Sequence, residues 1–201
     1  MAPALIVWDF DGVLNANVVE GRFVWADGLQ DDLGVDPAEF SRDLFASGLM
    51  GEIIRGRVDL LAHVSDWLAG QGHEVSGEAF LTYWFEKDAR PDAEVLGWLQ
   101  AHPARHVIGT NNESRRSAYI EGPMGYSSRV ERVFSSGRMG VAKPDAEFFT
   151  RIEDWAGVPS REILLVDDAE ANVAAARDRG WQAFHFVPGT RDALPGVLGL
   201  A

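Results

Sequence analysis

Five short apolar runs set the predicted architecture of the chain. They cover residues 4–8 (ALIVW), 106–108, 130–134, 163–166 and 183–187. The first run is continuous rather than alternating, which is typical of a strand buried on both faces of a parallel sheet, and similar runs recur at the other four places. Amphipathic helical patterns lie between the runs, at residues 91–102, 113–121, 144–155 and 169–179. This strand–helix alternation predicts an α/β fold with a doubly wound, Rossmann-like parallel sheet.

Two helix-boundary signals accompany these patterns. Pro144 stands where the first turn of a helix over 144–155 would begin, a position that proline favours. Gly180 follows the alanine-rich pattern of 169–179 and predicts the end of that helix.

Residues 16–90 follow a different pattern. Helical periodicity appears at 36–47, 51–68 and 76–87, with no convincing strand, and Asp36 and Ser76 are expected to cap two of the helices. We therefore expect a helical cap inserted after the first strand. The predicted division is an α/β core domain of residues 1–15 and 91–201 and a cap domain of residues 16–90.

Composition narrows the possible partners. The chain has 201 residues, no cysteine and a net charge of −13, so we expect no nucleic-acid partner, since that would require basic clusters. No apolar run approaches the roughly 18 residues that span a bilayer. No basic residue precedes the first run, so we expect neither a membrane segment nor a signal peptide. These features favour a cytoplasmic location and leave the oligomeric state open.

Polar residues gather where the predicted strands end. Because ligands bind beyond the carboxyl ends of strands in an open α/β sheet, we expect these residues to converge at one sheet edge. They are Asp9, Asp11 and Asn15 after the first run, Thr110, Asn111 and Asn112 after the second, Lys143 before the fourth, and Asp167 and Asp168 directly after it.

Four carboxylates in one pocket repel each other unless a cation is present. A hard divalent cation with oxygen ligands relieves this repulsion, and Mg²⁺ is the natural choice. The chain has no cysteine, and none of its five histidines is expected beside these strand ends, which argues against zinc. Because Mg²⁺ keeps water and phosphate oxygens among its ligands, the pattern implies a phosphorylated ligand.

Four segments resemble, in order, the motifs of the haloacid dehalogenase superfamily of hydrolases. They are DFDGVLN at 9–15, IGTNN at 108–112, Lys143 before Pro144, and LLVDDAEANVAAARDRGW at 164–181. The insert at 16–90 is similar to the cap of the family's small-cap branch. The resemblance implies a Mg²⁺-dependent phosphatase that hydrolyses a small phosphorylated metabolite through an aspartyl-phosphate intermediate.

The resemblance also implies a role for each matching residue. Asp9 would be the nucleophile. Asp11 would be the general acid and then the general base, with its backbone carbonyl on the metal. Lys143 would neutralise charge on the nucleophile and the phosphate. Thr110 and the backbone N–H of Asn111 would hold the phosphoryl oxygens.

The remaining implied roles concern the turn and the metal. Gly12 belongs to the substrate-binding set and would let the chain turn sharply after the strand. The metal ligands would be Asp9, Asp11 and Asp168, with Asp167 bound directly or through water. Asn172 would support Asp168 from behind.

Simpler structural roles compete with these assignments. Asp9 and Asp11 could be ordinary turn residues, and Asp167 and Asp168 could cap the helix that follows. Lys143 could be a solvated surface lysine. Asn15 and Asn17 fit turn positions better than ligand positions.

Other activities within the resemblance also remain open. A phosphomutase would share the covalent step. A phosphonate hydrolase would need a cap lysine, for which Lys87 is the candidate. Dehalogenation is disfavoured, because Asp11 stands where such relatives lack an acid. A non-catalytic protein that binds a phosphorylated ligand is the remaining alternative.

Overall fold

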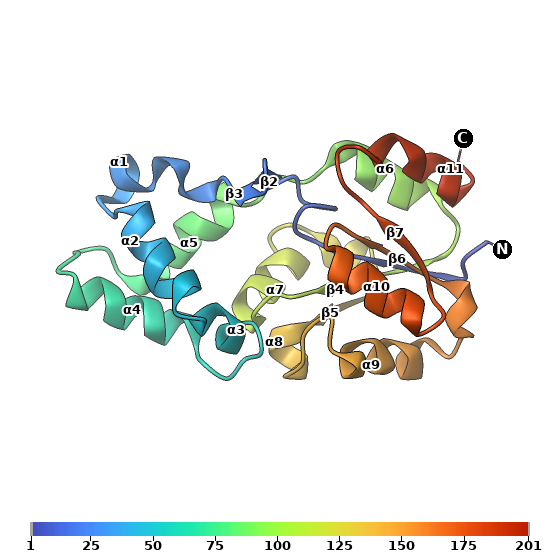
Figure 1. Ribbon diagram of the computed structural model, residues 1–201. Coiled ribbons are helices and arrows are strands. Elements are labelled where there is room, and N and C mark those ends of the chain that lie inside the picture. Colours follow the sequence, from blue (N-terminus) through green and yellow to red (C-terminus); the bar gives the residue numbers. More distant parts are fainter. Residues whose placement is uncertain (1, 201) are drawn as a thin grey trace.

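A five-stranded parallel sheet forms the centre of the core in this computed structural model, which describes residues 2–200. The strand order is β5-β4-β1-β6-β7, and every pairing is parallel (Figure 1). This confirms the α/β parallel sheet predicted from the apolar runs. The strands are β1 (Leu5–Trp8), β4 (Arg105–Thr110), β5 (Arg132–Ser135), β6 (Ile163–Asp167) and β7 (Gln182–His185).

Helices cover both faces of the sheet because alternate strand residues face opposite sides. Ile6 and Trp8 of β1 pack in one cluster with α6, α7 and α11, whereas Leu5 and Val7 pack in another with α9 and α10. The core helices are α6 (Ala93–Ala101), α7 (Ser114–Glu121), α8 (Ser136–Met139), α9 (Ala146–Ala156), α10 (Glu170–Asp178) and α11 (Leu194–Leu198). Short 3₁₀ turns lie at Tyr126–Ser128, Ser160–Glu162 and Arg191–Ala193.

One predicted helix boundary is wrong. The helix α9 begins at Ala146, so Pro144 lies before it rather than in its first turn. The Asn111 side chain holds the Lys143 backbone through two hydrogen bonds, and Asp145 N–H donates to Ala142 O at 2.8 Å. These bonds fix a turn where the proline pattern predicts the start of a helix.

The insert has a hydrophobic core of its own, built around Trp25, Phe40, Phe80 and Trp84. The indole rings of Trp25 and Trp84 stack with centroids 4.4 Å apart. Asp36 and Ser76 cap α2 and α5 as predicted. The helices of the insert are α1 (Leu29–Leu33), α2 (Pro37–Ser41), α3 (Leu49–Ile53), α4 (Leu60–Gly70) and α5 (Gly77–Lys87), with a 3₁₀ turn at Trp25–Gly28 and a π-helical turn at Arg42–Ala46.

Two expectations for the insert are wrong. It contains a small antiparallel hairpin of β2 (Val18–Val19) and β3 (Arg22–Phe23), although no strand was expected there. The continuous helix expected over 51–68 is also broken, because the chain turns between α3 and α4 at Gly56, which has φ +68°. Strands of two residues are too short for their periodicity to show in the sequence.

The insert joins the core through two chain segments that lie side by side. Ala16 N–H donates to Arg90 O at 2.7 Å, and Asp92 N–H donates to Leu14 O at 3.0 Å. The chain thus leaves and re-enters the core at one point. These bonds support the boundaries that we propose at 15/16 and 90/91.

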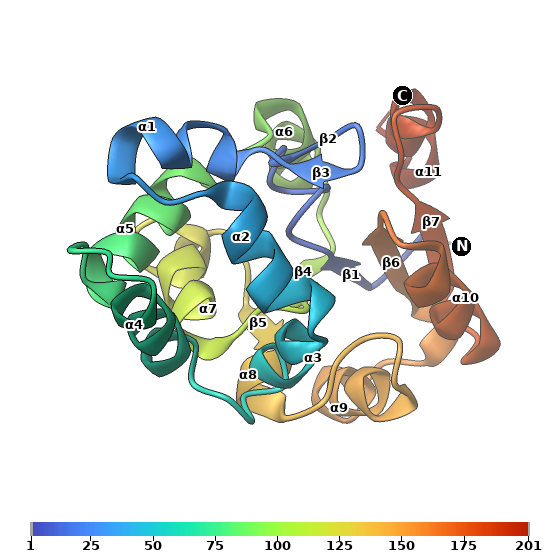
Figure 2. The same cartoon turned by 60° about the vertical axis from the view of Figure 1, so that its left-hand side comes forward.

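The turn between α3 and α4 forms a second contact between cap and core, visible where α3 approaches α8 (Figure 2). Gly56 packs so tightly on Gly137 that a Cβ at position 56 would overlap the Gly137 carbonyl oxygen. Nearby, Arg55 Nη2 lies 3.1 Å from Asp145 Oδ2. The cap therefore rests on the core at a point away from its hinge.

We expect Gly56→Ala to destabilise the protein more than Gly72→Ala does. Both glycines have positive φ, but a Cβ at Gly72 meets nothing within 4 Å, so the difference isolates the contact with Gly137. Overpacking of this kind costs about 1–3 kcal/mol. Urea unfolding of the two variants measures it, and equal midpoints would show that the cap does not rest on Gly137.

Candidate active site

A buried lysine lies between two carboxylates at the carboxyl edge of the sheet. Lys143 Nζ lies 2.9 Å from Asp9 Oδ1 and 2.6 Å from Asp167 Oδ2. All three side chains are almost fully buried. Lys143 is thus not a solvated surface residue, and its ammonium compensates charges that burial would otherwise make very costly.

Position in the fold brings these groups together. Asp9 directly follows β1, and Asp167 is the last residue of the neighbouring strand β6. Lys143 lies in the turn before α9 and is held there by Asn111, whose side chain bonds both the N–H and the C=O of the Lys143 backbone. The Asn111 side chain thereby positions Lys143, a contact that its place in the sequence did not reveal.

Asp167 and Asp168 have different surroundings. Asp167 is fully buried and, besides Lys143, accepts hydrogen bonds from Ala169 N–H and Asn172 Nδ2, each at 2.9 Å. The expectation that Asn172 supports Asp168 is therefore wrong, because its amide binds Asp167. Asp168 is only half-buried and lies against Gly12, where a Cβ would overlap its Oδ2 atom.

Three carboxylates lie close enough to share a cation. One oxygen from each of Asp9, Asp167 and Asp168 falls within 4.8 Å of the other two. Burial and the charge of Asp167 raise the pKa of Asp9 well above its usual range, although Lys143 opposes this. The same two causes raise the pKa of Asp168 to about 6. Crowded oxygen donors with raised pKa values fit a hard divalent cation such as Mg²⁺.

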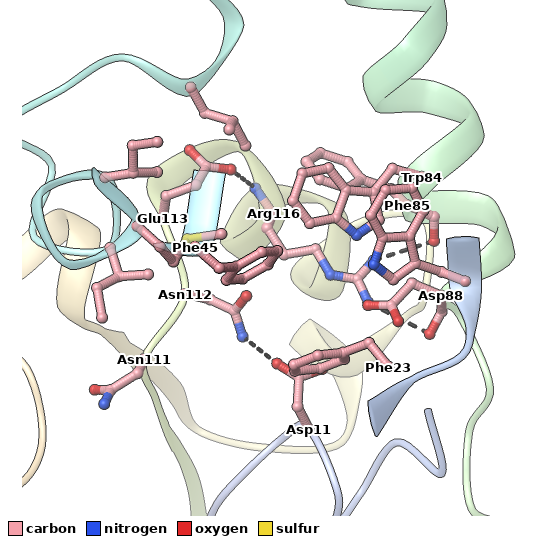
Figure 3. A pocket seen from close by; sticks show the side chains of 15 residues that line it. Asp11, Phe23, Phe45, Trp84, Phe85, Asp88, Asn111, Asn112, Glu113 and Arg116 are labelled. Carbon is pink, nitrogen blue, oxygen red and sulfur yellow. Dashed lines mark hydrogen bonds and ion pairs between the residues drawn. The ribbon is translucent and has the colours of Figure 1, made fainter. Parts of the chain in front are cut away.

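The side chain of Asp11 does not belong to that cluster and is held by side-chain amides. Asn17 Nδ2 donates to Asp11 Oδ1 at 2.7 Å, and Asn112 Nδ2 donates to Asp11 Oδ2 at 2.8 Å, with a longer bond of 3.5 Å from Asn15 Nδ2 to Oδ1. Asn112 also donates to Thr110 Oγ1 at 2.7 Å, so Thr110 and Asp11 share one neighbour. Figure 3 shows the Asn112 amide pointing at Asp11.

Polar residues of the hinge extend this network. Asn15 and Asn17 are fully buried, so the role of simple turn residues that we expect for them does not describe them fully. Asn17 Nδ2 also donates to Asp88 Oδ1 at 2.9 Å, and Asn15 Nδ2 donates to the Asp88 carbonyl at 2.7 Å. Asp88 in turn pairs with Arg116 at 2.7 Å. No sequence pattern indicates a role for Asp88, because a single acid near the end of a helix is common.

Two further expectations can be compared with the geometry. Lys87 Nζ lies 2.9 Å from Asp32 on the cap surface, and it does not line the cavity beside Asp11, so its position does not suit imine formation there. His185 ends β7 next to β6, contrary to the expectation that no histidine lies beside these strand ends. Its ring nitrogen Nε2 lies 2.8 Å from the Asp168 carbonyl oxygen, and the ring does not belong to the carboxylate cluster.

A parallel sheet with this carboxylate–lysine cluster and an inserted cap defines a class of hydrolase. The family model of haloacid dehalogenase-like hydrolases matches residues 3–180. The chain belongs to that family, which confirms the resemblance that its four motifs indicate.

Curated relatives and solved structures agree with this assignment. A phosphoglycolate phosphatase of Pseudomonas savastanoi pv. phaseolicola is 28% identical over 183 residues, covering 89% of this chain and 67% of the relative. That of Pseudomonas putida is 25% identical over 199 residues, covering 96% and 72%. A HAD family enzyme of Bacteroides thetaiotaomicron has the same fold, with a TM-score of 0.76, 18% identity and coverage of 94% and 96%. Within residues 2–200, no helix is both long and apolar enough to cross a bilayer.

The two lysines of the chain provide a matched test of the buried cluster. Lys143→Met leaves Asp9 and Asp167 without their cation, so we expect the free energy of unfolding to fall by about 3–5 kcal/mol. Lys87→Met removes an exposed pair with Asp32 and should cost about 0–1 kcal/mol. Urea unfolding in EDTA compares the variants, and a similar small loss in both would contradict the central role of Lys143.

Proposed function

We propose that this chain is a Mg²⁺-dependent phosphatase that hydrolyses a small phosphomonoester through an aspartyl-phosphate on Asp9. The observation that carries the proposal is the Lys143 ammonium between Asp9 and Asp167, at 2.9 and 2.6 Å. The Lys143 ammonium opposes the rise in pKa that burial causes at Asp9 and so favours the ionised carboxylate that a nucleophile requires. The Pseudomonas relatives are phosphoglycolate phosphatases, which supports phosphatase chemistry.

The proposed reaction has two displacements at phosphorus. An Asp9 carboxylate oxygen attacks phosphorus, and the bond between phosphorus and the alcohol oxygen breaks as Asp11 gives that oxygen its proton. Asp11 then takes a proton from water, whose oxygen attacks the same phosphorus. The bond to Asp9 breaks, and inorganic phosphate and free Asp9 result.

The residues that hold Asp11 suit both of its proposed proton transfers. Asn17 and Asn112 each donate an amide hydrogen to one of its oxygens, which fixes the direction of the carboxyl group. Asp11 also lines the cavity between cap and core, which is where the alcohol would leave. An oriented acid beside the leaving group is what general acid catalysis requires.

Asp9 and Asp168, with the Asp11 backbone carbonyl, would hold Mg²⁺. When bound, the ion would offset negative charge on the nucleophile and the phosphoryl oxygens. Asp167 uses both oxygens on Lys143, Asn172 and Ala169, which favours Asp168 as the direct ligand and Asp167 as its neighbour. Gly12, Thr110 and the backbone N–H of Asn111 would surround the phosphoryl group together with Lys143. The proposal keeps a cytoplasmic location and a small phosphorylated metabolite as substrate.

Phosphate release from 4-nitrophenyl phosphate tests the proposal. We expect activity with Mg²⁺, loss of it in EDTA, and a fall of about 10³-fold or more in Asp9→Asn, because the amide cannot serve as the nucleophile. Asp178→Asn, which changes an exposed acid at the end of α10, is the control and should be unaffected.

Two results would contradict this proposal. Unchanged activity in Asp9→Asn would remove the aspartyl-phosphate step. Product analysis by phosphorus NMR separates the phosphomutase alternative, because a mutase returns a phosphorylated isomer of a sugar phosphate in place of inorganic phosphate.

A further inference from the structure

A cavity of about 200 Å³ lies between the cap and the core, directly beside Asp11 (Figure 3). Most of the 15 residues that line it are apolar, and the apolar ones come from separate parts of the cap, including Trp25, Ile53 and Trp84. Pockets for drug-sized ligands usually measure about 300–1,000 Å³. The cavity is therefore suited to a small group of the size of a single ring or a short branched chain.

Two aromatic rings of this cavity are exposed in a way that is unusual for their type. Phe23, on β3, is 44% exposed and Phe45, in the π-helical turn, is 41% exposed. Both line the cavity, and Figure 3 shows their rings close to Asp11 and Asn112. Exposed aromatic rings that border a pocket commonly mark ligand contact, and π-helical turns occur often at functional sites. We take both rings as the outer walls of a binding site.

The charged groups of the cavity disfavour an anionic ligand. Among the described residues that line it, Asp11, Asp88 and Glu113 carry carboxyl groups, and Arg116 carries the positive charge. Glu113 is largely buried, and its carboxylate accepts hydrogen bonds from the backbone N–H groups of Arg115 and Arg116 at the start of α7. Carboxyl groups thus outnumber the cation in a largely apolar space, where charge is poorly screened.

Arg116 is already committed to the cavity wall. It is 4% exposed, its Nη2 lies 2.7 Å from Asp88 Oδ2, and its Nη1 donates to the Phe85 carbonyl at 3.1 Å. The guanidinium also lies over the rings of Phe85 and Tyr119, at 5.3 and 5.6 Å from their centroids. A ligand carboxylate would therefore meet a guanidinium whose charge Asp88 already offsets, and displacing Asp88 would leave a buried carboxylate unpaired.

We propose that the preferred substrate is the phosphomonoester of a small, uncharged, apolar alcohol, and that Asp88 and Glu113 exclude alcohols that carry a carboxylate. This inference rests on the proposed phosphatase function and specifies its leaving group. It separates this chain from its Pseudomonas relatives, whose name specifies phosphoglycolate, a substrate with a carboxylate in the leaving group.

A matched pair of substrates tests the charge preference. Benzyl phosphate and 4-carboxybenzyl phosphate differ by one carboxylate placed away from the reacting phosphate. We expect kcat/KM for benzyl phosphate to be higher by about 10²-fold, since a like charge against buried carboxylates is strongly unfavourable. Phosphoglycolate should be as poor a substrate as the carboxylated member of the pair.

Variants assign the preference to named residues. Phe23→Ala and Phe45→Ala should each raise KM for benzyl phosphate several-fold with little change in kcat, because the rings contact the leaving group away from the reacting atoms. Val197→Ala removes an exposed apolar side chain on α11 and should change neither constant. Glu113→Gln should narrow the gap between the two benzyl substrates, because it removes a cavity charge while leaving an oxygen to accept a hydrogen bond from the helix.

Binding without turnover separates the failure of this inference from failure of the proposed function. We expect calorimetric titration to show that benzylphosphonate binds more tightly than 4-carboxybenzylphosphonate, whether or not any ester is hydrolysed. If the protein hydrolyses phosphate esters but favours phosphoglycolate or the carboxylated substrate, the inference is overturned and the phosphatase proposal stands. If no ester is hydrolysed, the phosphatase proposal fails, and equal or tighter binding of the carboxylated phosphonate would overturn the inference as well.

Discussion

The Lys143 ammonium between Asp9 and Asp167 is the interaction on which the rest of the site depends. Two carboxylates that burial has removed from water are tolerable because one cation contacts both, at 2.9 and 2.6 Å. Satisfying that cation requires three parts of the chain to meet: the end of β1, the turn before α9 and the end of β6. The parallel register of β1 and β6 supplies the two acids at the same sheet edge, and Asn111 holds the turn that carries Lys143. The sheet therefore aligns the charged groups of the site in addition to forming the hydrophobic core.

The hinge of the cap is coupled to the same site through hydrogen bonds. Asn17 lies in the segment that leads into the cap and donates to both Asp11 and Asp88. Asp88 ends the last cap helix and pairs with Arg116 on the core helix α7. A displacement of the cap about this hinge would thus act on the carboxyl group proposed as the acid. These hydrogen bonds therefore link the position of the cap to the orientation of the Asp11 side chain.

The sequence predicts the sheet and the sheet-edge residues well, because both follow from local patterns. A buried parallel strand is a continuous apolar run, and the polar residue after it must lie at the ligand-binding edge. The sequence does not predict the hydrogen-bond partners of Asn15, Asn17, Asn112 and Asp88, since asparagine and aspartate in loops are far more often turn residues. The break in the helical pattern at Gly56 and the hydrogen-bond partner of Asn172 are not predicted for a similar reason. Both depend on which distant backbone or side chain packs against the residue, and periodicity along the chain does not carry that information.

The sheet edge and the cap contribute different parts of the proposed site. The groups proposed to act on phosphorus come from strand ends, where position is fixed by hydrogen-bonded register. The cavity wall comes instead from the hairpin, the π-helical turn, α5 and the start of α7, so a few substitutions there change its size and charge without disturbing the strands. Arg116 illustrates the point. Its charge is balanced by Asp88 at 2.7 Å, so exchanging that one acid for a neutral side chain would leave a cation without its partner in the cavity wall. Identity of 28% over the whole match to a phosphoglycolate phosphatase therefore does not by itself define the group that leaves.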